Sequence, residues 1–406
     1  FRRAMEHLVR VRLLHTAAVK LEHLELTAHE TPILAVDATG RNAAVPATSA
    51  IAILDLEWPY ATPRALSLPR HAATLVALEW QPASHASRLL AAVSNRGALR
   101  VYDVGAESAA RALVATLSEG EGTATQQPPQ LQQPRVDAIS WMSTTAQIIA
   151  ARSSAGVLVY DCRAPSVPIR VVGQQWPRDG AQPASAGGLC WASDDQNLLA
   201  VSEHSAVNVY DLRRPARPVL QWEPHLGAVV RSIERHGRWL LTCGSASAEA
   251  GAIRVWEMER KVGGSLGLFC ESPPQASSAV ARQIRLLSPG VSQTSPPLVA
   301  AVFDRVDDAD GSEPAVFAGE DPPTASSLSL WRLPASPPRG RVELLEYLCT
   351  AEGVDVAQAS LGGESCVPQL SGSSVYTDDL ASRFHIVTIG RDGQLRQWSL
   401  LADNVR

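Results

Sequence analysis

Short apolar segments that end in an aromatic residue recur along the whole chain, and this repetition restricts the folds open to it. Successive aromatic residues lie roughly 45 to 75 residues apart, which fits a unit of about 40 residues plus loops of varying length. Such a unit buries its apolar face only against its neighbours, so the repeats form one structure. The aromatic residues are Tyr102, Tyr160, Tyr210, Trp256, Trp331 and Trp398.

Two further apolar segments precede each of these, as in "VALEWQP" (76–82), "RLLAAVS" (88–94) and "GALRVYDV" (97–104). An earlier copy, "AIAILDLE" (50–57), lacks the aromatic residue, and counting it gives seven triplets. No long stretch keeps the 3.6-residue period of an amphipathic helix, so helix is minor. The sequence therefore predicts an all-β fold, a seven-bladed WD40-type β-propeller.

The same pattern predicts the domain bounds. Residues 1–19 are a lead-in segment, residues 20–401 form the propeller and residues 402–406 are a tail. The segment "KLEHLELTA" (20–28) is expected to pair with the last blade and close the ring, which removes open sheet edges. Two segments rich in Pro, Gln, Gly, Ser or acidic residues, 119–134 and 303–327, are expected to be solvated insertions.

The composition narrows the classes of partner and the compartment. The net charge of −5 argues against nucleic acid as a partner, because phosphate neutralisation needs a basic field. Six scattered cysteines without a C-x-x-C pair favour a reducing compartment, either the cytosol or the nucleus, and a cytoplasmic protein is expected. No apolar run reaches the roughly 18 residues that span a bilayer, so no transmembrane segment is expected.

No motif for phosphate binding, zinc hydrolysis or nucleophilic catalysis occurs in the chain. His29, His71 and His225 lie shortly before a first strand, where hydrogen bonding within the blade is expected. We therefore expect a protein that is not an enzyme, with no cofactor and no metal site. An enzyme with residues around the central channel remains an alternative without a supporting motif.

The sequences "VYDCR" and "VYDLRR" point to a partner site. They place Arg163 and Arg213 two residues after Asp161 and Asp211, where a strand leaves its blade. This resembles the W-D-x-R motif by which some propellers dock on the adaptor of cullin ubiquitin ligases, and an arginine fork can pair bidentately with a carboxylate. Partner binding is therefore predicted for Arg163, Asp211 and Arg213; alternatively, both arginines bond groups of their own blade.

Four stretches carry a more particular resemblance: 33–57, 76–104, 207–225 and 384–400. The segment "WQPASHASRLLAAVSN" from Trp80 to Asn95 is more particular than the generic repeat, and so is a first blade without a Trp-Asp ending. The chain resembles the family of WD repeat-containing protein 59, a subunit of GATOR complex 2, which is called the SEA complex in yeasts.

That resemblance implies a scaffold in amino-acid signalling to TOR complex 1. Its partners would be other protein subunits, among them other WD40 propellers. Its location would be the surface of the lysosome or vacuole, reached as a peripheral part of the complex. A substrate receptor for a cullin-type ubiquitin ligase and a scaffold propeller of another large complex are the alternatives.

Overall fold

The structure of the protein is a computed structural model. It describes residues 10–20, 33–37, 41–47, 49–56, 58, 61–68, 75–82, 89–94, 97–106, 108–118, 136–142, 145, 147–153, 156–164, 168, 170–172, 188–192, 197–225, 227–236, 238–244, 252–262, 265–272, 280–287, 298–304, 327–333, 343–344, 346–351, 358–362, 385–389 and 394–403.

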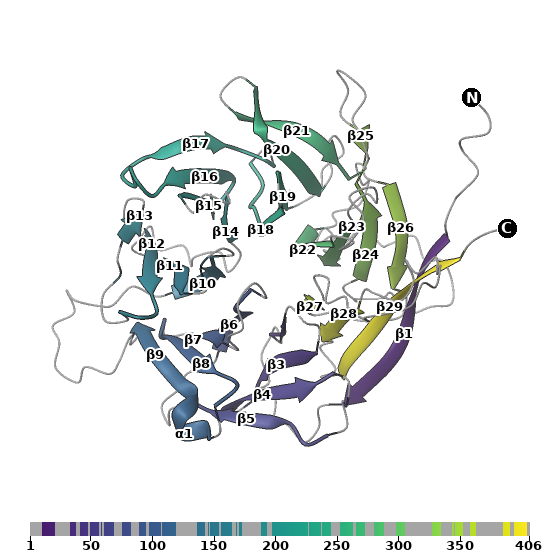
Figure 1. The fold of residues 1–406 in the computed structure, drawn as a ribbon. Helices are drawn as coiled ribbons and strands as arrows, with labels where there is room; N and C mark the ends of the chain where they lie inside the picture. The colour runs from purple at the N-terminus through teal and green to yellow at the C-terminus, as the bar shows by residue number, and fades with distance from the viewer. Residues whose placement is uncertain are drawn as a thin grey trace, which may run out of the picture.

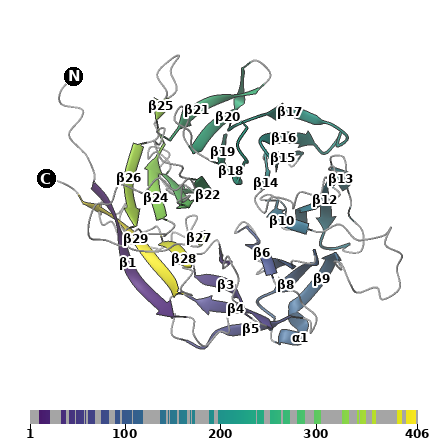
Figure 2. The same ribbon diagram turned by 180° about the vertical axis from the view of Figure 1, so that it is seen from behind.

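The described strands form seven sheets arranged around a common centre (Figures 1 and 2), and we call these sheets blades 1 to 7. Blade 1 contains β2 (Ala35–Val36), β3 (Asn42–Pro46), β4 (Ala50–Asp55) and β5 (Arg64–Ser67). Blade 2 contains β6 (Leu75–Trp80), β7 (Leu89–Ser94), β8 (Leu99–Asp103) and β9 (Leu113–Ser118), the last preceded by the short helix α1 (Ala109–Ala112). Blade 3 contains β10 (Val136–Trp141), β11 (Ile148–Ser153), β12 (Gly156–Asp161) and β13 (Arg170–Val172).

The remaining blades follow the same antiparallel order. Blade 4 contains β14 (Leu189–Trp191), β15 (Leu198–Glu203), β16 (Ala206–Asp211) and β17 (Pro218–Trp222). Blade 5 contains β18 (Ser232–His236), β19 (Trp239–Cys243), β20 (Ile253–Val262) and β21 (Ser265–Glu271), with β25 (Glu343–Leu344) added in parallel. Blade 6 contains β22 (Val280–Leu287), β23 (Leu298–Asp304), β24 (Ser327–Arg332) and β26 (Glu346–Ala351). Blade 7 contains β27 (Gln358–Gly362), β28 (His385–Ile389), β29 (Gln394–Asp403) and β1 (Arg10–Lys20).

The first three strands of each blade are the predicted triplets, and the recurring aromatic residues share one register position. Each aromatic residue lies opposite the second residue of the preceding strand, as in the pairs Tyr102–Leu90 and Trp256–Leu240. In blade 1 this position holds Leu54, opposite Ala43. The aromatic residue is thus a packing position that a large aliphatic side chain also fills.

The apolar core lies between blades. One buried cluster joins blades 1 and 2 through residues such as Ile53, Trp80 and Tyr102. Corresponding clusters join blades 2 and 3, 3 and 4, 4 and 5, and 5 and 6. Another cluster contains Leu54 of blade 1 and Leu395 of blade 7, so the first and last blades share one buried cluster.

The strand that joins the N-terminal part of the chain to blade 7 lies earlier than predicted. The strand β1 pairs antiparallel with β29, from Arg10 opposite Asp403 to Lys20 opposite Gln394. Residues 10–19 are therefore in a sheet and not in a lead-in. Of the predicted segment 20–28, Lys20 lies in β1, and residues 21–28 lie outside the described residues. The long strand β29 extends past residue 401 to Asp403 and pairs with β1 over almost its whole length.

Most of the two predicted insertions lies outside the described residues, namely all of 119–134 and residues 305–326. At the ends of the second insertion, Phe303 and Asp304 belong to β23 and Ser327 begins β24.

Candidate partner-binding face

One face of the propeller carries the turns that follow the third strands. In five blades an acidic residue lies opposite the first residue of the second strand, at the point where the third strand reaches this face. We call this set the carboxylate rim, and it comprises Asp55, Asp103, Asp161, Asp211 and Glu257.

The predicted residues of blades 3 and 4 make the same bidentate contact within their own turns. In blade 3, Nε of Arg163 donates to Oδ1 of Asp161 at 3.0 Å and Nη2 donates to Oδ2 at 2.6 Å. In blade 4 the matching distances from Arg213 to Asp211 are 2.9 and 2.8 Å. Both arginines thus bond their own blade, which was the alternative interpretation. Binding of a partner by Arg163, Asp211 and Arg213 stays a prediction.

These pairs keep the carboxylates ionised and leave the guanidinium groups at the surface. The side chains of Arg163 and Arg213 are 67% and 64% exposed, whereas both aspartates are 15% exposed. The hydrogen bonds from Arg163 lower the pKa of Asp161, and those from Arg213 lower the pKa of Asp211 to about 2. Each turn therefore presents a forked cation whose position is fixed by a carboxylate below it.

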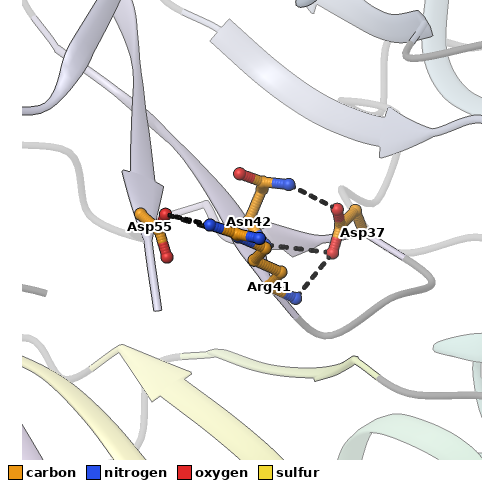
Figure 3. Close-up of polar contacts among 4 residues, drawn as sticks. All are labelled: Asp37, Arg41, Asn42 and Asp55. Atoms are coloured by element: carbon orange, nitrogen blue, oxygen red, sulfur yellow. Dashed lines mark hydrogen bonds and ion pairs between the residues drawn. The ribbon is translucent and has the colours of Figure 1, made fainter. Parts of the chain in front are cut away.

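Blade 1 supplies its arginine from a different loop (Figure 3). Arg41 precedes β3, and its Nη2 lies 3.2 Å from Oδ2 of Asp55. The carboxylate of Asp37 holds this loop, because Oδ1 accepts the backbone N–H groups of Arg41 and Asn42 while Oδ2 accepts Nδ2 of Asn42 at 2.7 Å. The carboxylate thus occupies the same position in blades 1, 3 and 4. Its arginine comes from the loop before the second strand in blade 1 and from the turn after the third strand in blades 3 and 4.

Blade 5 repeats the arrangement of blade 1, and sequence reasoning missed both cases. Nη1 of Arg238 lies 3.8 Å from Oε1 of Glu257, and the Arg238 guanidinium stacks 4.3 Å from the centre of the Trp239 ring. A signal was present in the sequence. A Gly-Arg pair stands immediately before the second strand in these two blades, at 40–41 and 237–238, and neither blade has an arginine two residues after its rim carboxylate.

Backbone hydrogen bonds join the two loops of blades 1, 3, 4 and 5 on this face. The N–H that follows the rim carboxylate donates to the carbonyl just before the second strand, as from Leu56 to Arg41 and from Met258 to Arg238. The same bond joins Cys162 to Gln147 and Leu212 to Asn197. These bonds fix the backbone that carries the rim arginines.

Trp58 is the most exposed large apolar residue of the described chain, at 69%. Its backbone is fixed, because its N–H donates to the Asp55 carbonyl and its own carbonyl accepts from Ala61. Close by in the sequence, Arg64 of blade 1 donates to the carbonyls of Val104 and Ala106 in the turn after the third strand of blade 2. This face thus combines exposed arginine and tryptophan, two residue types that are enriched at binding hot spots.

The imidazole of His225 bonds within blade 5, as predicted. Nε2 lies 3.1 Å from Oγ1 of Thr242, and Nε1 of Trp256 donates to the same hydroxyl at 3.0 Å. Burial and then the charge of Arg254 lower the pKa of His225 to about 3. The histidine is therefore neutral at physiological pH and acts as a structural link. His29 and His71 lie outside the described residues.

The stability of the fold is expected to fall as His225 is protonated in the unfolded chain. Below the ordinary pKa of 6.5 the imidazole of His225 is protonated in the unfolded state, whereas in the folded state it stays neutral down to about pH 3. This one residue then lowers the free energy of unfolding by about 1.4 kcal/mol per pH unit in that window. Denaturant unfolding of the wild type and of His225→Gln at pH 6.5 and 5.0 measures the effect. The variant is expected to show the smaller pH dependence, and equal slopes would contradict the assignment.

Within the described part of the chain, no group of three or more His, Cys, Asp and Glu side chains is placed to hold a metal ion. No helix in that part is long and apolar enough to cross a membrane. Cys162, Cys190, Cys243 and Cys270 form no disulfide among the described residues, and burial raises the pKa of Cys162 and of Cys190 to about 12. Both thiols are therefore poor nucleophiles.

The repeated sheets define the chain as a WD40-type β-propeller, and two solved structures share this fold. One is Raptor from Chaetomium thermophilum, with a TM-score of 0.59 and 12% identity over 98% of this chain and 29% of that chain. The other is the WD40 domain of coronin from Toxoplasma gondii, with a TM-score of 0.57 and 14% identity over 98% of this chain and 90% of that chain. No protein-family model and no curated protein matches the sequence.

Proposed function

We propose that this propeller is a non-catalytic scaffold that binds other proteins, and that it is a propeller subunit of a GATOR complex 2 or SEA-type assembly. In this proposal it supports amino-acid signalling to TOR complex 1. The protein is cytoplasmic and reaches the surface of the lysosome or vacuole only through the complex. The observation that carries the scaffold function is the face on which exposed arginines and Trp58 stand on hydrogen-bonded turns.

Support for the particular complex comes from the sequence. The stretches that resemble the family of WD repeat-containing protein 59 include the first three strands of blade 1, with Leu54 at the aromatic position, and the first three strands of blade 2. They also include the third and fourth strands of blade 4 and the second and third strands of blade 7. The proposal therefore rests on stretches spread around the ring.

Gentle affinity isolation of the full-length protein, with mass spectrometry of the proteins that co-purify, tests the proposal. We expect several other propeller subunits to be recovered in stable amounts. Recovery of the protein alone, or only in an unrelated assembly, would refute membership in a complex of this type.

A cullin-type ligase receptor is the second candidate, because Arg163 and Arg213 present the same exposed fork on neighbouring blades. In that case the variant Arg163→Ala with Arg213→Ala would lose the ligase adaptor from the isolated material while keeping its thermal unfolding temperature. The pair Arg41→Ala with Arg238→Ala is the matched control, since both arginines are 53% exposed and pair with rim carboxylates of other blades. Unchanged adaptor recovery by the first variant would eliminate this candidate.

A further inference from the structure

The turn between the third and fourth strands of blade 4 carries a positive charge that its own carboxylate does not balance. The sequence "DLRRPARPV" (211–219) contains three arginines and one aspartate in a chain whose net charge is −5. Arg213 pairs with Asp211, which leaves the charges of Arg214 and Arg217. The matching turn of blade 3, "DCRAPSVPI" (161–169), has one arginine for its one aspartate. The turn of blade 3 therefore lacks the excess positive charge that blade 4 carries.

Both additional arginines are exposed and lie on a well-defined backbone. Within the described residues, neither the Arg214 nor the Arg217 guanidinium makes a hydrogen bond or an ion pair. The backbone N–H of Arg214 donates to the Asp211 carbonyl at 2.8 Å. Pro215 and Pro218 fix their own φ angles in the same turn. The entropic cost of ordering this loop when a partner binds is therefore small.

The turn leads directly into β17, which is the last strand in the order of blade 4 and lies on the outer circumference of the ring (Figures 1 and 2). Val219 is 54% exposed and Gln221 is also exposed, whereas Leu220 and Trp222 are buried. An edge strand has unpaired N–H and C=O groups along one side, and an extended segment can pair with them.

The neighbouring blade shows that an outer edge of this propeller can take up such a segment. In blade 5, β25 pairs in parallel with the fourth strand β21, with Cys270 opposite Glu343 and Glu271 opposite Leu344. The segment comes from a distant part of the same chain, since it lies between strands of blade 6. In blade 4 the order of the described strands ends at β17.

We propose that β17 is a docking edge for an extended acidic segment of a partner protein. The backbone of that segment pairs with the free side of β17, and its carboxylates lie over Arg214 and Arg217. Opposite charge selects the occupant, and the exposed side chain of Val219 gives it an apolar contact. The proposal deepens the scaffold function by assigning one surface and its partner chemistry, and it rests on that function only in requiring a protein partner.

A fluorescent ten-residue peptide of alternating Glu and Val, titrated into the 406-residue chain, tests the proposal by anisotropy. We expect Arg214→Gln with Arg217→Gln to weaken binding about 5- to 20-fold, as the loss of two surface charge contacts implies. The matched control, Arg41→Gln with Arg238→Gln, removes two charges from other blades and is expected to change affinity less than about twofold. An equal loss in the control would overturn the proposal.

Hydrogen exchange measured by mass spectrometry separates strand addition from loose charge attraction. The peptide is expected to slow amide exchange in residues 217–222. Charge-dependent binding of the peptide without this protection would overturn the proposal. The proposal would also be overturned if the chain bound vesicles of 30% phosphatidylserine in phosphatidylcholine but did not bind the peptide. These outcomes are independent of affinity isolation, which reports membership in an assembly and not the use of this edge.

Discussion

Replacement of Trp141 by alanine is expected to lower the free energy of unfolding by about 3 to 5 kcal/mol, the range for deleting a buried aromatic side chain. Trp141 is 3% exposed and packs in the cluster between blades 2 and 3. Its Nε1 donates to the Glu79 carbonyl at 3.1 Å, and its backbone N–H donates to Oε1 of Glu79 at 3.2 Å. The substitution thus leaves a cavity and removes the indole hydrogen bond to the Glu79 carbonyl at a blade interface.

Trp141 belongs to a series of equivalent bonds. Nε1 of Trp80 in blade 2 donates to Ala35 of blade 1, and Nε1 of Trp191 in blade 4 donates to Ser140 of blade 3. In each case the acceptor is a first-strand carbonyl of the preceding blade. We therefore expect blades 1 to 4 to unfold together. Trp141→Ala is expected to lower both the cooperativity and the midpoint of the unfolding transition.

Urea unfolding followed by circular dichroism measures the effect, with two comparison variants. Trp141→Phe keeps most of the volume and isolates the indole hydrogen bond, for which a loss of about 1 to 3 kcal/mol is expected. Trp58→Ala removes an exposed tryptophan and is expected to change stability by less than about 0.5 kcal/mol. If Trp141→Ala is no more harmful than Trp58→Ala, the interblade bonds do not stabilise the fold.

The strand triplets could be predicted because they rest on local information. A short apolar run, a turn and an aromatic residue at a fixed place suffice to locate three strands of a blade, and the aromatic residues share one register. The fourth strands gave no such signal. In β17 two of the five residues are buried, and in β5 one of the four is buried. Their sequences therefore lack a clear apolar pattern.

The features that depend on contacts between distant residues could not be derived from spacing. Arg213 and Asp211, whose pairing within the blade was the alternative to partner binding, are two residues apart, whereas Arg41 and Asp55 are joined across a hairpin. The tryptophan bonds connect blades, and the position of β1 depends on its match with β29. In each case the geometry of the fold brings together groups that lie far apart in the sequence.

A second large loss of stability is expected for Arg254→Ala in blade 5. Nε of Arg254 donates to Oε2 of Glu271 at 3.0 Å, and its Nη1 donates to the Pro224 carbonyl. The two charged side chains are only 11% and 16% exposed. Removing the cation leaves a largely buried carboxylate and a carbonyl without their partner, which costs about 3 kcal/mol. The pair Arg41–Asp55, at 53% and 31% exposure, provides the contrast, with a loss below about 1 kcal/mol for Arg41→Ala.

The double variant Arg254→Met with Glu271→Leu distinguishes a lost charge partner from lost packing. If the cost of Arg254→Ala comes from the isolated carboxylate, replacing both charges with apolar side chains recovers most of the stability. A double variant as unstable as Arg254→Ala would instead assign the loss to packing. The variant also bears on His225, because the charge of Arg254 is the second cause of its low pKa. Burial is the larger cause, so the imidazole is expected to stay neutral and the pH dependence between 6.5 and 5.0 to persist.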